Sequence, residues 1–303
     1  MKNTHLQHPE DSILTGNLNV LDWFTTPDSH LSVKMDGAPA IVWGMNPKTG
    51  NFFVGTKSVF NKVKIKINES HDDIDRNHQG NVAHILHKCF DYLPHIDLIV
   101  QGDFIGFGGD NAYQPNTIVY VFPDIVMNEI IIAPHTGYYA KDDLRDAISF
   151  PLTEELPSND DVLFVQSNGT INGYMDDIKQ VCKFAKQMST LCEFVDKNTA
   201  RKMEKVFNTF IRLGAVLNEQ SLHTAMKESV SEDIDINLIR LWLLVKSIKE
   251  DVLYMCSHDS DIQSFIETQR IDCEGYVMNN EDGMYKLVNR EEFSRANFLV
   301  RQW

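Results

Sequence analysis

The sequence predicts a mixed α+β protein in which one helical segment interrupts a mainly antiparallel β region. Three observations support this fold class. Short apolar runs bounded by turn residues recur from 31 to 135. Apolar residues then recur with a period near 3.6 from 175 to 267. A hairpin pattern returns at 274–288. We therefore expect two domains, namely a β core over 1–174 and 269–303 and a helical insertion over 175–268.

Composition is that of an ordinary globular chain. Of its 303 residues, 43% are hydrophobic and 23% are charged, and no apolar run is long enough to cross a bilayer. The polar residues 1–11 do not resemble a signal peptide, so export is not expected. The five cysteines are scattered and form no C-x-x-C pair. They indicate reduced thiols and a cytoplasmic protein, not a disulfide framework or a zinc site.

The net charge of −15 restricts the partners that the protein can bind. A protein that follows a long DNA duplex neutralises many phosphates and is normally basic on at least one face. Extensive duplex binding is therefore disfavoured, whereas a small local phosphate site is compatible with this charge.

The first β region has three expected strands, around Val33, at Ile41–Trp43 and at Phe52–Val54. A fourth is expected over Lys62–Ile67, where lysines alternate strictly with apolar residues. Together with Lys57, this segment carries four lysines in ten residues. It is either a solvated strand face that protects a sheet edge or an anion-binding wall beside Lys34.

Residues 71–78 are expected to form a loop that leads into a helix over 81–93. His84 and His87 share one face of that helix, and several aspartates precede it. A metal cluster is one interpretation, although the spacing matches no standard site; helix capping and surface histidines are the alternative.

The next expected strand begins at Leu98 and ends in Gly102-Asp103, and a glycine-rich turn follows it. This turn is not a phosphate loop, because no Gly-Lys-Ser/Thr follows it. Asp103 either faces a pocket or is a turn residue. Further strands are expected at 117–122, 130–133 and 161–166, with a looser segment at 134–139.

The helical segment contains three apolar stripes that predict three helices, around 178–191, 203–213 and 238–255. The hairpin that follows pairs Glu274–Met278 with Met284–Val288 through a turn at 279–283. This places Glu274 near the start of one strand and Lys286 on its partner. The two side chains either face a pocket or form an ordinary cross-strand ion pair.

Lys34 begins the motif Lys34-x-Asp36-Gly37 at the edge of an expected strand. An ammonium is costly to bury, so a lysine that lines a pocket loses its proton more readily and becomes a nucleophile. The Asp-Gly pair predicts a tight turn that leads the chain into the next strand. Taken alone, the motif also fits a hairpin turn with a surface lysine.

The order of these motifs resembles that of the covalent nucleotidyltransferases, which include ATP-dependent DNA ligases, RNA ligases and mRNA capping enzymes. The matching elements are Lys34-x-Asp36-Gly37, Gly102-Asp103-Phe104, Tyr120–Asp124, Glu274-Gly275 and Lys286-Leu287-Val288. Longer phrases around Lys34 and over residues 286–298 resemble those of uncharacterised ligase-like proteins of tailed bacteriophages. The resemblance implies an antiparallel, ATP-grasp-like adenylylation core and leaves the helical insertion outside it.

The resemblance also implies a role for each matching residue, with ATP and Mg²⁺ or Mn²⁺ as cofactors. Lys34 would attack the α-phosphate of ATP and form lysyl-AMP, in a loop shaped by Asp36 and Gly37. Lys57 would contact the nucleotide or a phosphate, and Lys286 would neutralise the α-phosphate. Asp103 would bind the ribose and Phe122 would stack on adenine. Glu274, with Asp103, would hold the metal.

This sequence departs from the family at three points. Val288 stands where a second lysine is usual, and Arg290 is the candidate substitute. Asp103 replaces the usual glutamate. Only fifteen residues follow Val288, so no C-terminal oligonucleotide-binding barrel is expected.

These features favour a ligase that acts on RNA ends over one that acts on long DNA duplexes, with RNA repair in a bacterial host cytoplasm as the setting and no membrane partner. The alternatives are nucleotide transfer to another acceptor, such as a cap or a protein, and a degenerate phage protein that binds nucleotide or nucleic acid without ligation. The oligomeric state is open.

Overall fold

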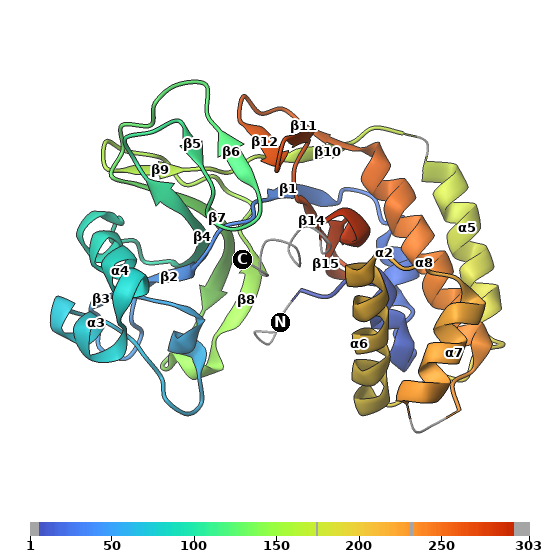
Figure 1. Ribbon diagram of the computed structural model, residues 1–303. Coiled ribbons are helices and arrows are strands. Elements are labelled where there is room, and N and C mark those ends of the chain that lie inside the picture. Colours follow the sequence, from blue (N-terminus) through green and yellow to red (C-terminus); the bar gives the residue numbers. More distant parts are fainter. Residues whose placement is uncertain (1–5, 174, 231–232, 294–303) are drawn as a thin grey trace. The chain divides into compact units, whose positions relative to one another are not determined.

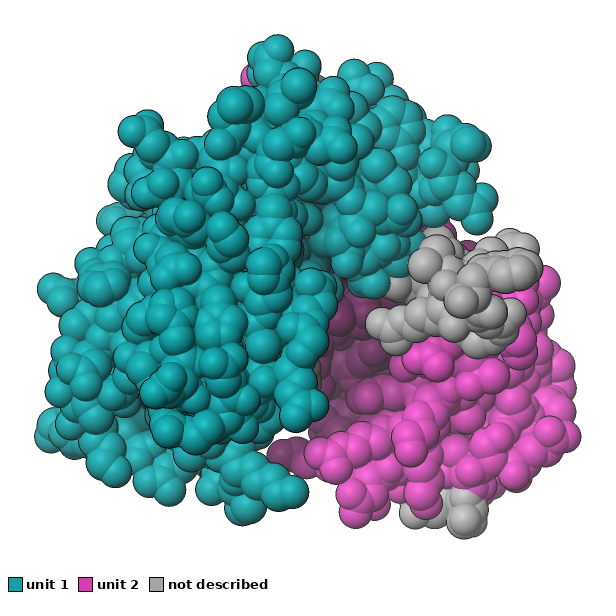
Figure 2. Space-filling view, turned by 60° about the vertical axis from the view of Figure 1, so that its left-hand side comes forward, with its two compact units in different colours: residues 1–5, 34–167, 260–273 teal, residues 6–33, 168–259, 274–303 magenta. Residues whose placement is uncertain are grey.

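A computed structural model describes residues 6–173, 175–230 and 233–293. The described chain is mixed α and β with antiparallel sheets, as expected (Figure 1). It divides into two compact units, each built from segments that are distant in the sequence (Figure 2). Of the described residues, unit 1 comprises 34–167 and 260–273, and unit 2 comprises 6–33, 168–173, 175–230, 233–259 and 274–293.

The main sheet of unit 1 has the strand order β3-β2-β4-β7-β8, and β9 pairs in parallel with β7. The strands are β2 (Ala40–Met45), β3 (Phe52–Gly55), β4 (Ile99–Phe107), β7 (Ile130–Tyr139), β8 (Ile148–Pro151) and β9 (Val162–Phe164). Within the main path every neighbouring pair is antiparallel.

Both faces of this sheet are covered near its centre, which explains the continuous apolar run Ile41-Val42-Trp43. Ile41 and Trp43 pack into one cluster with the buried face of α4 (Gly80–Tyr92), while Val42 packs on the opposite side with Phe53 and Tyr138. Helix α3 (His71–Asn77) precedes α4. The 3₁₀-helix η2 (Lys57–Phe60) lies between β3 and α3, and η3 (Leu144–Asp146) connects β7 to β8.

A smaller antiparallel sheet of unit 1 has the order β13-β12-β6-β5. Its strands are β5 (Ala112–Tyr113), β6 (Val119–Val121), β12 (Gln263–Ile266) and β13 (Gln269–Ile271). The strands β12 and β13 were not expected: β12 lies within the segment that was assigned to the helical insertion, and no strand was assigned to residues 269–271.

Three expectations for unit 1 are wrong. Residues 62–67 form no strand: Lys64 has a left-handed backbone (φ 56°) and Val63 is 78% exposed. The expected loop at 71–78 is helix α3, which Ser70 caps by accepting from Asp73 N–H. The expected loose segment 134–139 continues β7, whose irregular pairing accommodates Pro134, since proline cannot donate a ladder hydrogen bond.

Unit 2 contains the long helices, and the three that were expected are present. They are α5 (Met175–Ser189), α6 (Lys197–Leu213) and α8 (Ile236–Met255). Helix α7 (Glu219–Ser229) was not expected, because only Leu222 and Met226 of its residues are buried. Asn218 begins it by accepting from Ser221 N–H. Strands β10 (Gly169–Ile171) and β11 (Cys256–His258) pair beside this helical segment.

The hairpin also lies in unit 2, as β14 (Gly275–Asn280) and β15 (Gly283–Val288), and its expected pairing is confirmed. It forms a three-stranded sheet in the order β1-β14-β15 with β1 (His30–Lys34). The short helices α1 (Pro9–Ser12), η1 (Ile13–Thr15) and α2 (Asn19–Trp23) are also in unit 2, and Trp23 Nε1–H donates to Gly283 O at 3.1 Å.

The two units divide the chain differently from the expected domains. Residues 6–33 and 274–293 group with the helices, whereas the sequence-based division places them with the β core. The hairpin packs against α8 and the N-terminal helices, which explains this grouping. Within the described residues, no helix combines the length and apolar character that crossing a bilayer requires.

Candidate functional site

The loop that follows Lys34 is fixed by the Asp36 carboxylate. Lys34 is the half-buried last residue of β1, and Asp36 is buried. The Asp36 carboxylate accepts hydrogen bonds from Asn116 Nδ2 at 2.9 Å, Thr117 N–H at 2.8 Å and Ile118 N–H at 3.3 Å. The Asp36 N–H in turn donates to the Tyr120 hydroxyl. Asp36 therefore shapes the loop and is held to the segment that leads into β6.

Gly37 allows this loop to lie directly against β4. A Cβ added at Gly37 would lie 2.7 Å from the Asp103 Cβ and 2.8 Å from the Phe104 carbonyl oxygen. Ala38 N–H donates to that same carbonyl at 3.0 Å, and Phe104 N–H donates back to Pro39 O at 3.0 Å. A side chain at position 37 would push the Lys34 loop away from the strand that carries Asp103.

We expect Asp36→Ala to lower the free energy of unfolding by about 1–3 kcal/mol, because it leaves buried N–H donors without an acceptor. Chemical denaturation measures the change. Asp124→Ala, which removes an exposed carboxylate from the same unit, is the control and should change stability by less than about 0.5 kcal/mol. Equal effects of the two substitutions would show that the Asp36 hydrogen bonds do not hold the loop.

A β-bulge brings His135 to Asp103. Gln101 pairs with Thr136 and Gly102 pairs with Pro134, so His135 is the additional residue of β7. Bulges redirect side chains, and here the imidazole Nε2 lies 3.7 Å from the Asp103 carboxylate. The Asp103 side chain is 19% exposed. It is therefore a partly accessible carboxylate that lies beside an imidazole, between Ala40 and Ala133 of the neighbouring strands.

Polar side chains surround the His135 ring. The Tyr138 hydroxyl donates to Gln101 Oε1 at 2.8 Å, and the Gln101 amide nitrogen lies 3.3 Å from His135 Nε2. The other ring nitrogen, Nδ1, lies 2.7 Å from Thr136 Oγ1. The Asp103 carboxylate, when ionised, can accept donors such as ribose hydroxyls.

Two further residues of unit 1 were expected at the site. Phe122 is buried and meets the Tyr113 ring edge-on, with ring centroids 5.5 Å apart. Its surface is therefore already covered by protein, which does not suit an adenine platform in this conformation. Lys57 is exposed at the start of η2, where Thr56 Oγ1 accepts from Ser58 N–H.

The remaining expected residues lie in unit 2. Glu274 is buried and directly precedes β14, and Lys286 of β15 is in register with Val277. Gly275 has φ 149°, and a Cβ there would lie 2.2 Å from the Leu287 carbonyl oxygen. Only glycine suits this backbone, which accounts for the Glu274-Gly275 motif. Lys34 and Asp103 belong to unit 1, so the expected site residues are divided between the units.

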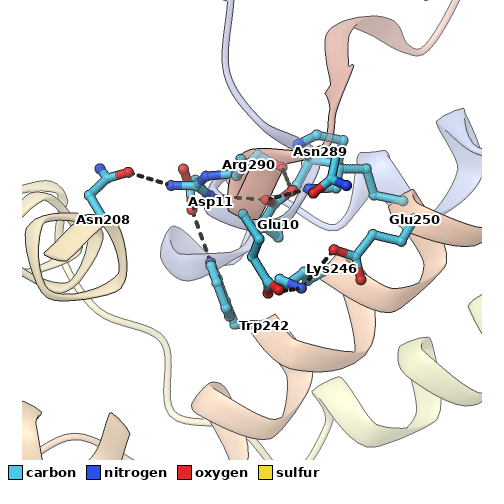
Figure 3. A network of polar contacts seen from close by, with 12 residues as sticks. Glu10, Asp11, Asn208, Trp242, Lys246, Glu250, Asn289 and Arg290 are labelled. Atoms are coloured by element: carbon cyan, nitrogen blue, oxygen red, sulfur yellow. Dashed lines mark hydrogen bonds and ion pairs between the residues drawn. The ribbon is translucent and has the colours of Figure 1, made fainter. Parts of the chain in front are cut away.

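Arg290 does not substitute for the absent second lysine, because its guanidinium is part of a buried network (Figure 3). It contacts Glu10 Oε1 at 2.9 Å and Asp11 Oδ1 at 3.0 Å, and it donates to Asn208 Oδ1 at 2.8 Å. Lys249 Nζ, fully buried, also contacts Glu10 Oε1, at 3.0 Å. The network joins the N-terminal segment, α6, α8 and the residues after the hairpin.

Burial and charge act in opposite directions on the pKa values of the two acids in this network. Burial raises the pKa of Glu10, but Lys249, His8 and Arg290 together hold it well below its usual range. Burial raises the pKa of Asp11, and Arg290 opposes that increase only in part. The neighbouring cations therefore favour the ionised form of Glu10 more strongly than that of Asp11.

Among residues 6–173, 175–230 and 233–293, no cluster of three or more His, Cys, Asp or Glu side chains is arranged to hold a metal ion. His84 and His87, which were considered as ligands, have other contacts. The His87 Nδ1 lies 2.7 Å from the Nδ1 of His71, and its Nε2 lies 3.0 Å from Asp75. The ring of His84 packs against Phe107.

Comparison with protein families finds a family whose model matches most of the chain. The model described as "Family of unknown function (DUF6267)" matches residues 3–237 and 231–302. The chain belongs to the DUF6267 family. No curated protein and no solved structure matches it.

Sequence reasoning missed the residues of this DUF6267 protein that support the Lys34 loop and Asp103. Tyr120 was noted only as part of a motif, His135 was placed in a loose segment, and Asn116 was given no role. The available signal for His135 was Pro134 within an apolar run, since proline inside a strand marks an edge or a bulge. Nothing local in the sequence links Asn116 to Asp36.

Proposed function

We propose that this DUF6267 protein is an ATP-dependent polynucleotide ligase that joins RNA ends through lysyl-AMP on Lys34. The observation that carries the proposal is the direct packing of Gly37 against Asp103 and Phe104. According to the resemblance, the motifs that contain Gly37 and Asp103 are distant in sequence but bind the same ATP molecule. Contact between the two motifs supports that assignment. Cys89, Cys182 and Cys192 are free thiols, in keeping with the cytoplasmic setting that the proposal includes.

The proposed first step forms one bond and breaks one. The neutral Lys34 amine attacks the α-phosphorus of ATP, the bond from that phosphorus to the bridging oxygen breaks, and pyrophosphate leaves. The amine nitrogen loses a proton and becomes the phosphoramidate nitrogen. The AMP group then passes from Lys34 to the 5′-phosphate of an RNA end. A 3′-hydroxyl attacks that 5′-phosphate, and AMP leaves. Asp103 would bind the ribose, and Lys286 would neutralise the α-phosphate.

Mg²⁺ suits the carboxylates that the proposal assigns to it. Such ions commonly bind through one or two carboxylates together with substrate phosphates, so a cluster of three protein ligands is not required. Glu274 and Asp103 offer only oxygen donors, which this ion prefers. When bound, it would supply charge neutralisation on the phosphoryl oxygens.

A second candidate function is nucleotide or nucleic-acid binding without ligation. Val288, at the position of the absent second lysine, is buried, and Arg290 is held by Glu10 and Asp11. Neither residue therefore supplies, in this conformation, the positive charge of the second lysine that covalent nucleotidyltransferases usually have. Such a protein would bind ATP and form no covalent adduct.

Labelling with ATP that carries the isotope at either the α- or the γ-phosphate separates these functions. Under the proposal, protein incubated with Mg²⁺ becomes covalently labelled from α-labelled ATP and not from γ-labelled ATP. Added pyrophosphate should remove the label, since it reverses the step. Label from the γ-position would indicate phosphorylation instead, and no label from either would leave only the binding function. Competition by unlabelled GTP tests transfer of the capping type.

A further inference from the structure

We propose that residues 61–67, here called the lysine loop, bind the phosphodiester backbone of a single-stranded polynucleotide substrate. This inference rests on the proposed function for the identity of the substrate. The loop follows η2 in unit 1 and contains Lys62, Lys64 and Lys66, with Lys57 shortly before it.

The lysine loop is anchored at its C-terminal end. Asn68, fully buried, pairs with Val54 through hydrogen bonds in both directions, of 3.0 and 3.2 Å. Lys66 N–H donates to Ser58 O, and Lys66 Nζ donates to Asn77 O at 2.6 Å. Asn77 is the last residue of α3, where a cation is favoured by the helix carbonyls. Lys66 therefore anchors the loop.

The central part of the loop is presented to solvent. Lys57, Lys62 and Lys64 are exposed, and within the described part of the chain none of them forms an ion pair. Within the same part, the N–H groups of residues 62–65 make no backbone hydrogen bond. Lysine ammonium groups and backbone N–H groups are the donors that proteins commonly direct at phosphates.

Lys64 adopts a conformation that needs support from its surroundings. Its φ of 56° is unfavourable for a long side chain by about 1–2 kcal/mol. Non-glycine residues in this region persist where neighbouring structure fixes them, and they gather at functional sites. The anchors at Lys66 and Asn68 explain how the loop keeps this shape.

Acidic residues next to the loop are bound to other groups. The Glu69 carboxylate accepts hydrogen bonds from Asn46, Thr49 and Asn51. Asp73 accepts from Ser70 and pairs with Arg76. The exposed lysines therefore do not have these neighbouring carboxylates as partners, and their charge is available to an external anion.

A polynucleotide fits this surface better than an anionic membrane. The net charge of −15 repels a polyanion over most of the chain, so binding requires a local basic segment. Val63 and Ile65 are also exposed, and apolar residues beside lysines occur at membrane surfaces. Two aliphatic side chains, however, offer little area for insertion, and unit 1 also contains the Lys34 loop and Asp103.

Fluorescence anisotropy tests the inference with labelled single-stranded RNA and DNA of the same sequence, about 12 nucleotides long. The variant is Lys62→Ala/Lys64→Ala. The control Lys202→Ala/Lys205→Ala removes two exposed lysines of α6 and has the same net charge. We expect the first pair to weaken binding about tenfold near 0.1 M salt and to reduce the log–log salt slope by about 1.4. The control should leave both unchanged.

The same variants separate this inference from the proposed function. If wild type is adenylylated but the loop variant binds RNA and DNA with the same affinity as the control variant, the lysine loop is not the binding surface. If wild type is not adenylylated yet binding falls only with the loop variant, the inference stands and the ligase proposal fails. Lysine-dependent binding to phosphatidylserine vesicles, without binding of either oligonucleotide, would overturn the inference in favour of a membrane surface.

Discussion

Replacing Arg290 by alanine should lower the free energy of unfolding by about 3–5 kcal/mol, because it removes the cation that pairs with Asp11 and one of the two that pair with Glu10. Arg290 contacts both Glu10 and Asp11, and Glu10 is fully buried. In that variant Lys249 would remain beside Glu10. Of the partners of Asp11 drawn in Figure 3, only the Trp242 indole N–H, 3.0 Å away, would remain. Guanidinium or urea denaturation measures the loss.

Arg240→Ala is the matched control for Arg290→Ala. Arg240 pairs with Glu219 on the surface, where both side chains are more than 40% exposed, so its removal should cost less than about 1 kcal/mol. If Arg290→Ala were as mild as the control and instead abolished nucleotide transfer, Arg290 would be a site residue and our structural assignment would be wrong. Whichever of the two substitutions causes the larger loss in the free energy of unfolding identifies the arginine whose charge stabilises the fold.

Substitution of Lys34 by alanine should abolish covalent labelling from α-labelled ATP, by at least about a thousandfold. Lys34→Arg should be equally inactive, because a guanidinium stays protonated and cannot act as the nucleophile. Both variants should unfold at the wild-type denaturant concentration within experimental error, since Lys34 is only half-buried.

Lys48→Ala provides the comparison for the Lys34 variants, because Lys48 is exposed in unit 1 and has no assigned role. It should label like wild type. If Lys34→Arg labelled like Lys48→Ala, another residue would be the nucleophile and the proposed mechanism would have to be abandoned, whatever the fate of the lysine loop.

The parts of the fold that the sequence predicts are those whose signal is local. Strand β2 was expected because Ile41-Val42-Trp43 is apolar and turn residues bound it, and both faces of this strand are indeed buried. The β14–β15 hairpin was expected from its turn and flanking strands, and its pairing is as expected. In each case the local pattern agrees with the tertiary contacts.

The parts that sequence reasoning missed depend on distant partners. Lys62–Ile67 alternates like a strand, yet a strand needs a neighbouring strand for its backbone groups. The β-bridge in this region is made by Asn68 with Val54, after the alternating segment has ended. The polar His71–Asn77 segment became a helix because Ser70 caps it and Ile74 is buried. An alternating sequence predicts which side chains would share one face of a strand, but it does not show that a partner strand is present.

The candidate site shows the same limit. The Lys34-x-Asp36-Gly37 motif was identified from adjacent residues, whereas the groups that hold Asp36, residues 116–118, come from a separate segment. Arg290 was interpreted as a substitute for a lysine because it follows Val288 closely. Its actual partners, Glu10 and Asp11, lie at the other end of the chain, and nothing in its local sequence indicates them.

Mass spectrometry of tryptic peptides after incubation with ATP and Mg²⁺ tests the central claim most directly. Trypsin does not cleave after a modified lysine, so adenylylated protein should yield an uncut peptide of residues 3–48 that carries one AMP at Lys34. The proposal predicts this adduct and its disappearance when pyrophosphate is added. AMP on any other residue, or an unmodified peptide ending at Lys34 in protein shown to bind ATP, would contradict it.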